Sequence, residues 1–411
     1  MRFPIAAAIA LFIGAGALLP ARSGPRALPP ASTTFYETRF EKQPGVAQLT
    51  AVGRRLFFDA SLSASGRTAC ASCHDPAHAY GPPNARAVQL AGPDGKTPGL
   101  RAAPSLRYVQ KVPPFTEHFF EADGNDSEDQ GPAGGHAWDG RARSLHEQAV
   151  LPLLSPLEMA NRDSAEVVAR VRRSPAAAAL QEAFGPHVLD DPEKGFRAIL
   201  LCLEVFQQDP AEFYPYSSKY DAFLRGQVKL AKDEMRGLAL FNDAAKGNCA
   251  SCHISAVREG EFPAFSDWGF IALGVPRNRA VADPKSQDLG LCGPMRTDLS
   301  GHAEYCGRFR TPTLRNVSKR AVFFHNGKFT SLEEVVRFYA ERDTNPARWY
   351  PRRADGSIDS YDDIPPAMRG NVNREPPFGG KPGSRPRLDR SEIRDVVAFL
   401  RTLEDGYTAK D

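Results

Sequence analysis

A five-residue pattern, Cys-x-x-Cys-His, occurs twice in this 411-residue chain and restricts the folds open to it. The copies span residues 70–74 and 249–253, and both carry Ala-Ser between the two cysteines. The pattern is typical of covalent c-type haem attachment, in which two thiols bond to the porphyrin and the His binds the iron. The sequence therefore predicts two haem c groups, held by Cys70, Cys73, His74, Cys249, Cys252 and His253.

Two other interpretations of these cysteines are less favourable. Zinc modules usually bring their ligand pairs together over roughly 12–20 residues, whereas much more of the chain separates these two copies. A redox-active Cys-x-x-Cys dithiol sits on a βαβ framework, and the sequence shows no such pattern. Haem attachment is therefore the favoured interpretation of both motifs.

Charge and hydropathy indicate which classes of partner are unfavourable and where in the cell the protein is expected. Lys and Arg total 52 against 49 Asp and Glu, with no basic run, so nothing favours nucleic acid as a partner. Residues 1–23 combine Arg2, an apolar stretch and small residues near Ser23, as in a secretory signal peptide. The alternative, a membrane anchor, needs a longer stretch. We expect a periplasmic protein without stable membrane insertion after signal cleavage.

Three of the seven cysteines lie outside the two motifs. Cys292 and Cys306 bracket a loop with Gly and Pro, and they can pair in an oxidising compartment. Cys202 lies inside an apolar run, where a small buried side chain is the simplest interpretation. We therefore expect one disulfide and one buried thiol.

The region around each motif follows the same plan. A helix-like stretch precedes each motif, at 53–57 and at 237–241, and an apolar helix pattern follows at 196–206 and at 391–400. Residues 122–136 and 354–388 are rich in turn-forming residues. The predicted fold is mainly α, with two cytochrome c-like haem domains in tandem, at 33–215 and 226–411, joined by long irregular loops.

Five short segments carry a resemblance to a known family. They read Trp-Asp-Gly-Arg-Ala at 138–142, Ser-Pro-Leu-Glu-Met at 155–159, Arg-Thr-Pro-Thr-Leu-Arg-Asn-Val at 310–317, Phe-Phe-His-Asn-Gly at 323–327 and Leu-Glu-Glu-Val at 332–335. Together they resemble the bacterial dihaem cytochrome c peroxidase family, which includes MauG. The resemblance covers residues 45–405.

The resemblance implies roles for three side chains near the first haem. It makes the first haem the place where peroxide binds, and it puts Trp138 between the two haems as an electron relay. Gln148 and Glu158 match the pair beside the bound peroxide, where a carboxylate can move a proton between the two oxygens. The neighbouring Glu147 is the alternative to Glu158, and only the family spacing separates them.

The second haem needs a sixth ligand, whose identity tunes its redox potential. Typical dihaem peroxidases place a Met on the helix after the Phe-His-x-Gly turn, and MauG has a Tyr there. Counting along this chain, the position is Tyr339. Met295, in the loop between Cys292 and Cys306, is the alternative. An oxygen ligand stabilises ferric and higher-valent iron, which leans toward a MauG-like second haem.

This chain departs from the family pattern in two places. Peroxidases that require activation carry a His that caps the first haem, and no His lies between His78 and His118. The first haem should therefore be open to peroxide. The family also holds a calcium ion with an Asn just before an Ala-Pro-Ser-Leu segment, and this chain has Ala102 there. That change puts the calcium in doubt, although carbonyl ligands near Arg320 and Val322 would remain.

These observations favour a periplasmic dihaem peroxidase that reduces hydrogen peroxide. Its electrons would come from a small donor protein, a cytochrome c or a cupredoxin. One alternative is a MauG-like enzyme that oxidises side chains of a partner protein. The other is a dihaem electron carrier without catalysis, which a proton-handling carboxylate and an open first haem argue against.

Overall fold

The structure is a computed structural model of the chain, and it describes residues 35–120, 128–281 and 287–408. The predicted signal segment at 1–23 lies outside the described residues, and so does part of the predicted excursion at 122–136. Within the described ranges, no helix combines the length and the apolar character needed to cross a membrane.

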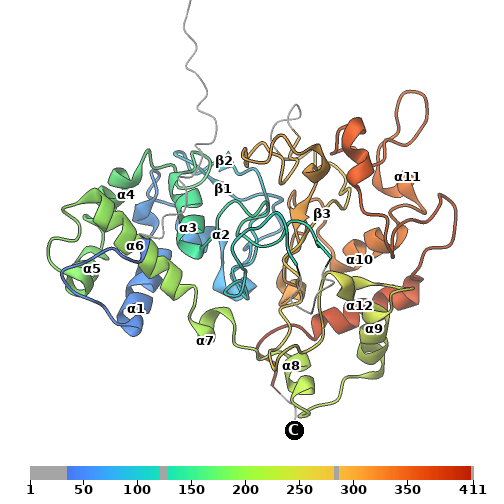
Figure 1. The fold of residues 1–411 in the computed structure, drawn as a ribbon, viewed down its shortest axis with the longest axis horizontal. Helices are drawn as coiled ribbons and strands as arrows, with labels where there is room; N and C mark the ends of the chain where they lie inside the picture. Colours follow the sequence, from blue (N-terminus) through green and yellow to red (C-terminus); the bar gives the residue numbers. More distant parts are fainter. Residues whose placement is uncertain (1–34, 121–127, 282–286, 409–411) are drawn as a thin grey trace, which may run out of the picture.

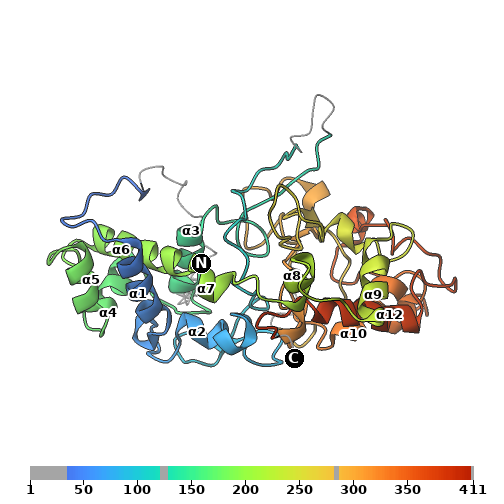
Figure 2. The same cartoon turned by 90° about the horizontal axis from the view of Figure 1, so that it is seen from below.

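The described chain is mainly helical and forms two halves that lie side by side, at the left and right of Figure 1. The first half contains α1 (Val46–Phe57), α2 (Cys70–Cys73), α3 (Leu145–Leu154), α4 (Ser164–Val171), α5 (Ala177–Phe184), α6 (Pro192–Phe206) and α7 (Pro210–Phe213). The second half contains α8 (Lys219–Leu224), α9 (Lys232–Asn242), α10 (Leu332–Glu341), α11 (Pro346–Trp349) and α12 (Arg390–Arg401). The same division is visible in Figure 2, and it confirms the predicted fold class.

Regular strands are short in the part of the chain that the structure describes. β1 (Leu90–Ala91) pairs antiparallel with β2 (Thr97–Pro98), and β3 (Phe270–Ile271) pairs antiparallel with β4 (Phe309–Arg310). Long loops make up most of the remaining chain, particularly where the two halves meet.

The first half is built on close packing of α1 against α6. Gly53 permits this approach, because a Cβ at that position would lie 2.0 Å from the carbonyl oxygen of Cys202 in α6. The rings of Phe57 and Phe206 meet edge to face beside this contact, with centroids 5.4 Å apart. Cys202 is fully buried here, as predicted.

The second half repeats this arrangement with α9 and α12. A Cβ on Gly237 would lie 2.0 Å from the carbonyl oxygen of Asp395, and the rings of Phe241 and Phe399 meet with centroids 5.2 Å apart. The sequence predicts the same equivalence between the stretches at 53–57 and 237–241. The structure therefore confirms that the chain repeats one helical plan.

Helices α6 and α12 each begin with an Asp that caps the helix N-terminus. Asp191 accepts hydrogen bonds from the backbone N–H groups of Glu193 and Lys194, ahead of α6. Asp389 does the same for Ser391 and Glu392 at the start of α12. Such caps satisfy N–H groups that a helix leaves without partners at its first turn.

Each half has its own hydrophobic core. One cluster of buried side chains runs from Leu49 to Phe213 and the other from Tyr220 to Leu403. We propose that the halves are two domains with the predicted ranges, 33–215 and 226–411. The second cluster also takes up α8, which precedes residue 226, because Tyr220 packs there against Phe399.

Loops of the first half reach across to the second half. The Ala102 N–H donates to the His325 carbonyl at 2.7 Å. The Tyr108 hydroxyl donates to Asp405 at 2.7 Å, and Arg107 forms an ion pair with the same carboxylate at 3.0 Å. These contacts fix the loop at 101–108 between the two cores.

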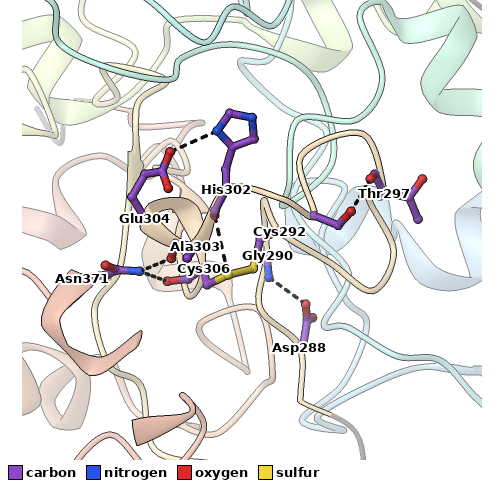
Figure 3. The surroundings of a disulfide bond; sticks show 10 residues. Asp288, Gly290, Cys292, Thr297, His302, Ala303, Glu304, Cys306 and Asn371 are labelled. Carbon is purple, nitrogen blue, oxygen red and sulfur yellow. Dashed lines mark hydrogen bonds and ion pairs between the residues drawn. A yellow bond between two sulfur atoms is a disulfide. The ribbon is translucent and has the colours of Figure 1, made fainter. Parts of the chain in front are cut away.

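The predicted disulfide between Cys292 and Cys306 is present, with the two Cα atoms 5.0 Å apart (Figure 3). The Asn371 side chain donates to the carbonyls of Ala303 and Cys306 and so holds the end of this loop. Asp288 accepts from the Gly290 N–H at the other end. The bridge therefore closes a loop that is anchored on both sides.

Candidate active site: two cavities lined by the Cys-x-x-Cys-His motifs

The first motif forms the short helix α2, and its His follows at the helix end. The His74 Nδ1 lies 3.1 Å from the Tyr80 carbonyl oxygen, which makes Nδ1 the protonated nitrogen. Desolvation lowers the pKa of His74 to about 4, so the ring is neutral at pH 7. A neutral imidazole whose Nδ1–H is held by a carbonyl presents Nε2 to a metal.

The second motif is arranged in the same way on the short 3₁₀ turn at Cys249–Ser251. The His253 Nδ1 lies 2.8 Å from the Phe265 carbonyl oxygen, and desolvation again lowers the pKa of the ring. Two segments far apart in the sequence thus present a neutral imidazole beside a pair of thiols that form no disulfide.

The first motif lines a cavity that collects all three residues predicted to act at the first haem. Its lining includes Cys70, Cys73, His74, Trp138, Gln148 and Glu158. It also includes His136, Arg141 and Arg310, for which the sequence predicts no role, and Met295, the alternative ligand predicted for the second haem. Met295 lies at the first motif, and this position argues against it as an iron ligand at the second.

Glu158 lines this cavity, and the exposed surface of its side chain is accounted for by the cavity. The protein around the carboxyl removes solvent from it and raises its pKa, while Arg141 acts in the opposite direction. Glu147 lies at the start of α3, where its carboxylate accepts from the Arg143 N–H at 2.8 Å. Glu147 does not line the cavity, so the geometry favours Glu158 of the two.

The second motif lines a cavity of mostly apolar side chains from the second half. Tyr339, on α10, lines it together with Cys249, Cys252 and His253. Its ring stacks on Phe324 and packs against Phe378, with centroids 6.2 Å and 5.2 Å away. The hydroxyl has no hydrogen-bond partner among the described residues, and desolvation with the two nearby thiols raises its pKa.

A common wall separates the two cavities. Five residues line both of them: Pro104, Ser105, Val109, Trp138 and Arg310. The Trp138 Nε1–H donates to the Ala102 carbonyl at 2.8 Å, and the Trp138 carbonyl accepts from the Arg310 N–H at 2.9 Å. The indole is therefore fixed in the wall between the two motifs, which is the position that the family resemblance implies for it.

The residues present fit two haem c groups. The motif thiols and imidazoles divide between two cavities, and the described residues contain no cluster of three His, Cys, Asp or Glu that could hold a zinc ion. The buried Arg310 Nη1 has no hydrogen-bond partner among the described residues. A haem brings two carboxylates into such a cavity, and a buried guanidinium without an acceptor suits them.

Two further buried polar residues, Asp139 and His136, lie close to Trp138 in the sequence. Asp139 is fully buried and pairs with Arg101 and Arg141, each at 2.7 Å. These cations lower its pKa against the effect of desolvation. His136 is also buried, and desolvation lowers its pKa to about 3, so it is neutral. Arg310 begins the Arg-Thr-Pro-Thr-Leu-Arg-Asn-Val segment that carries the family resemblance, but that segment does not indicate a position at the first cavity. No motif indicates His136, and only its closeness to Trp138 in the sequence could have suggested it.

Known proteins share this architecture. The family described as di-haem cytochrome c peroxidase matches residues 47–229. The methylamine utilization protein MauG of Paracoccus denitrificans is 35% identical over 390 residues, which cover 92% of each chain. The cytochrome c551 peroxidase of Nitrosomonas europaea is 26% identical and covers 88% of this chain and 81% of its own.

A solved structure agrees with these relatives. The diheme peroxidase BthA of Burkholderia thailandensis superposes with a TM-score of 0.77 at 39% identity, covering 91% of this chain and 89% of that chain. Fold and site together define a tandem dihaem c-type oxidoreductase. The chain belongs to the dihaem cytochrome c peroxidase and MauG family. Membership implies two haem c cofactors, in agreement with the two motifs.

Proposed function

We propose that this protein is a periplasmic dihaem peroxidase that reduces hydrogen peroxide at the first motif. One observation carries the proposal: Glu158 and Gln148 face the same cavity as His74, and solvent removal raises the pKa of the Glu158 carboxyl. A carboxylate with a raised pKa is suited to accept a proton and give it back within one reaction.

The reaction takes up two electrons and two protons and converts hydrogen peroxide into two molecules of water. Haem c iron, when bound, supplies the redox chemistry that accompanies cleavage of the O–O bond. Glu158 accepts the proton from the inner oxygen and returns it to the leaving oxygen. The Gln148 amide offers hydrogen bonds that orient the peroxide.

Trp138 connects the two motifs in this proposal. Its indole lines both cavities, and both its Nε1–H and its backbone carbonyl are engaged. An indole held by these two hydrogen bonds stays in one position between the two motifs. We assign it the relay of electrons from the second haem to the first.

Tyr339 is the proposed sixth ligand at the second motif. It lines the cavity with His253, and its hydroxyl is not engaged by another described residue. The test is Tyr339→Phe, followed by ferric absorption and spin-resonance spectra. Altered signals from the second haem are expected, and unaltered signals would rule out ligation. Tyr220→Phe, which removes a hydroxyl that donates to the Ser255 carbonyl and does not line this cavity, is the matched control.

A second function is favoured by the same tyrosine. An oxygen ligand stabilises oxidised iron, so the second haem could hold an oxidising equivalent and draw electrons from side chains of a partner protein. This would be a MauG-like activity. A passive carrier is less consistent with the site, because a carrier has no use for a carboxylate that handles protons.

The proposed partners follow from the proposed location. The disulfide between Cys292 and Cys306 is typical of an oxidising compartment such as the periplasm. There the electrons would come from a small cytochrome c or cupredoxin, or from side chains of a protein substrate. No sequence feature favours nucleic acid.

The proposal is tested by comparing Glu158→Gln with Glu147→Gln in the fully haem-loaded protein. General acid–base groups contribute about 10²–10⁴-fold to a rate. We expect a loss of that size in kcat/KM for peroxide in Glu158→Gln, and nearly wild-type values in the neighbouring control. Equal activity of the two variants would refute the proton-transfer role. Wild-type protein that consumes no peroxide with any small reductant would refute the peroxidase assignment.

A further inference from the structure

Arg320 lies at the junction of the two halves and binds backbone from both. Its Nε donates to the Val322 carbonyl at 3.2 Å, and its Nη2 donates to the Ala103 carbonyl at 3.2 Å. Ala103 belongs to the loop of the first half that holds Trp138, because the preceding carbonyl, that of Ala102, accepts the indole N–H. One guanidinium thus links the two halves next to the wall between the cavities.

No Asp or Glu of the described residues neutralises the charge of Arg320, whose side chain also lines the cavity of the second motif. Within the described ranges, no Asp or Glu forms an ion pair with it, although most other arginines at this junction have one. Desolvation lowers the pKa of Arg320 only to about 10, so it carries a full positive charge at pH 7. The junction therefore contains a fixed cation whose ligands are carbonyl oxygens.

The same place does not fit a calcium ion. Calcium takes six to eight oxygen ligands, and Ala102 contributes no side-chain oxygen. The Ala102 carbonyl already accepts from Trp138, and the carbonyls of Ala103 and Val322 already accept from Arg320. A divalent ion at these oxygens would also stand against the guanidinium, and like charges at such a distance repel.

We propose that the Arg320 guanidinium is the resident cation of the domain junction and takes the place of a bound calcium ion. It stabilises the carbonyls of both halves from within the chain, so the junction, and with it the Trp138 indole, is independent of calcium. The inference concerns the junction alone and does not depend on which substrate the protein oxidises or reduces.

The first test uses the haem-loaded wild-type protein. We expect less than one calcium per chain by elemental analysis after dialysis. We also expect the same thermal unfolding midpoint and the same haem absorption spectrum in a calcium chelator and in added calcium. One tightly held calcium per chain, or a midpoint that falls in chelator, would overturn the proposal.

The second test converts the junction back to a metal site. In the double variant Ala102→Asn with Arg320→Ala, an amide oxygen is added and the guanidinium is removed. We expect an unfolding midpoint at least about 4 °C below wild type without calcium, and recovery when calcium is added. The control Lys319→Ala removes an adjacent cation that pairs with Glu404 at the surface, and it should show neither effect.

The two tests fail in different ways. If the double variant folds and its midpoint does not respond to calcium, the guanidinium does not occupy a cation position and the proposal is refuted. If the double variant does not fold, the calcium content and chelator response of the wild-type protein decide alone. Neither outcome alters the Glu158 experiment, which addresses the reaction.

Discussion

Replacing Gly237 with Ala tests the packing on which the second haem domain is built. The added Cβ would stand 2.0 Å from the Asp395 carbonyl oxygen and 2.9 Å from the Phe399 Cβ, whereas real Cβ contacts do not fall below 3.0 Å. Helix α9 must therefore move from α12 by about 1 Å. Such a shift also opens the contact between the rings of Phe241 and Phe399.

The cost can be estimated from two opposing effects. Overpacking of a core costs about 1–3 kcal/mol and sometimes more, and a contact with rigid backbone belongs at the upper end of that range. Alanine is better than glycine inside a helix by roughly 1 kcal/mol, which offsets part of the loss. The expected net destabilisation of the second half is about 2 kcal/mol, or a fall in Tm of roughly 4–8 °C.

Differential scanning calorimetry of the haem-loaded protein measures this shift. Gly370→Ala is the control, because a Cβ there meets no atom within 4 Å and the backbone needs no left-handed conformation. We expect its Tm to stay close to wild type. A Gly237→Ala protein that unfolds at the wild-type temperature would refute the packing argument, and with it the reason for a glycine at the matching position of α1.

Three further predictions follow. Because desolvation raises the pKa of Glu158 above its ordinary 4.5, its base form is lost at higher pH than in an exposed Glu. The acid limb of kcat/KM should therefore lie above pH 4.5 and be missing in Glu158→Gln. Trp138→Phe leaves the Ala102 carbonyl without its donor and should cost about 1–3 kcal/mol in unfolding free energy. Stopped-flow spectra of this variant should show slower electron transfer between the haems. An unchanged rate would contradict the relay role of Trp138. The double variant Cys292→Ser with Cys306→Ser opens a loop of 14 residues and should lose roughly 3 kcal/mol by denaturant titration, whereas an unchanged midpoint would show that the loop is held by its hydrogen bonds alone.

Several features could be predicted before any coordinates because their causes are local in the sequence. The haem attachment groups lie within five residues of each other, so the spacing alone indicates the chemistry. The α6 and α12 helices follow from apolar periodicity and from capping residues at their starts. The disulfide could be predicted because Cys292 and Cys306 bracket a short loop with Gly and Pro and an oxidising compartment is expected.

Other features depended on packing that no local pattern records. Glu147 and Glu158 are both acidic and both near α3. Only the family spacing favours Glu158 from the sequence, and the fold adds that Glu158 lines the first cavity whereas Glu147 does not. Met295 is the alternative ligand that the sequence offers for the second haem, but its side chain lines the first cavity. His136 and Arg310 line the first cavity, and neither a periodicity nor the motif that begins at Arg310 indicates this position.

Arg320 shows the same division between local and tertiary information. The family resemblance implies a calcium-binding Asn where this chain has Ala102, and it leaves open what replaces the calcium ion. The fold brings a guanidinium from a segment more than two hundred residues away onto the Ala103 carbonyl. Attachment of haem is encoded by neighbouring residues, because covalent bonds need only a short peptide. The surroundings of each haem are decided by chain crossings, because cavity walls are assembled from loops that meet only after both cores have packed.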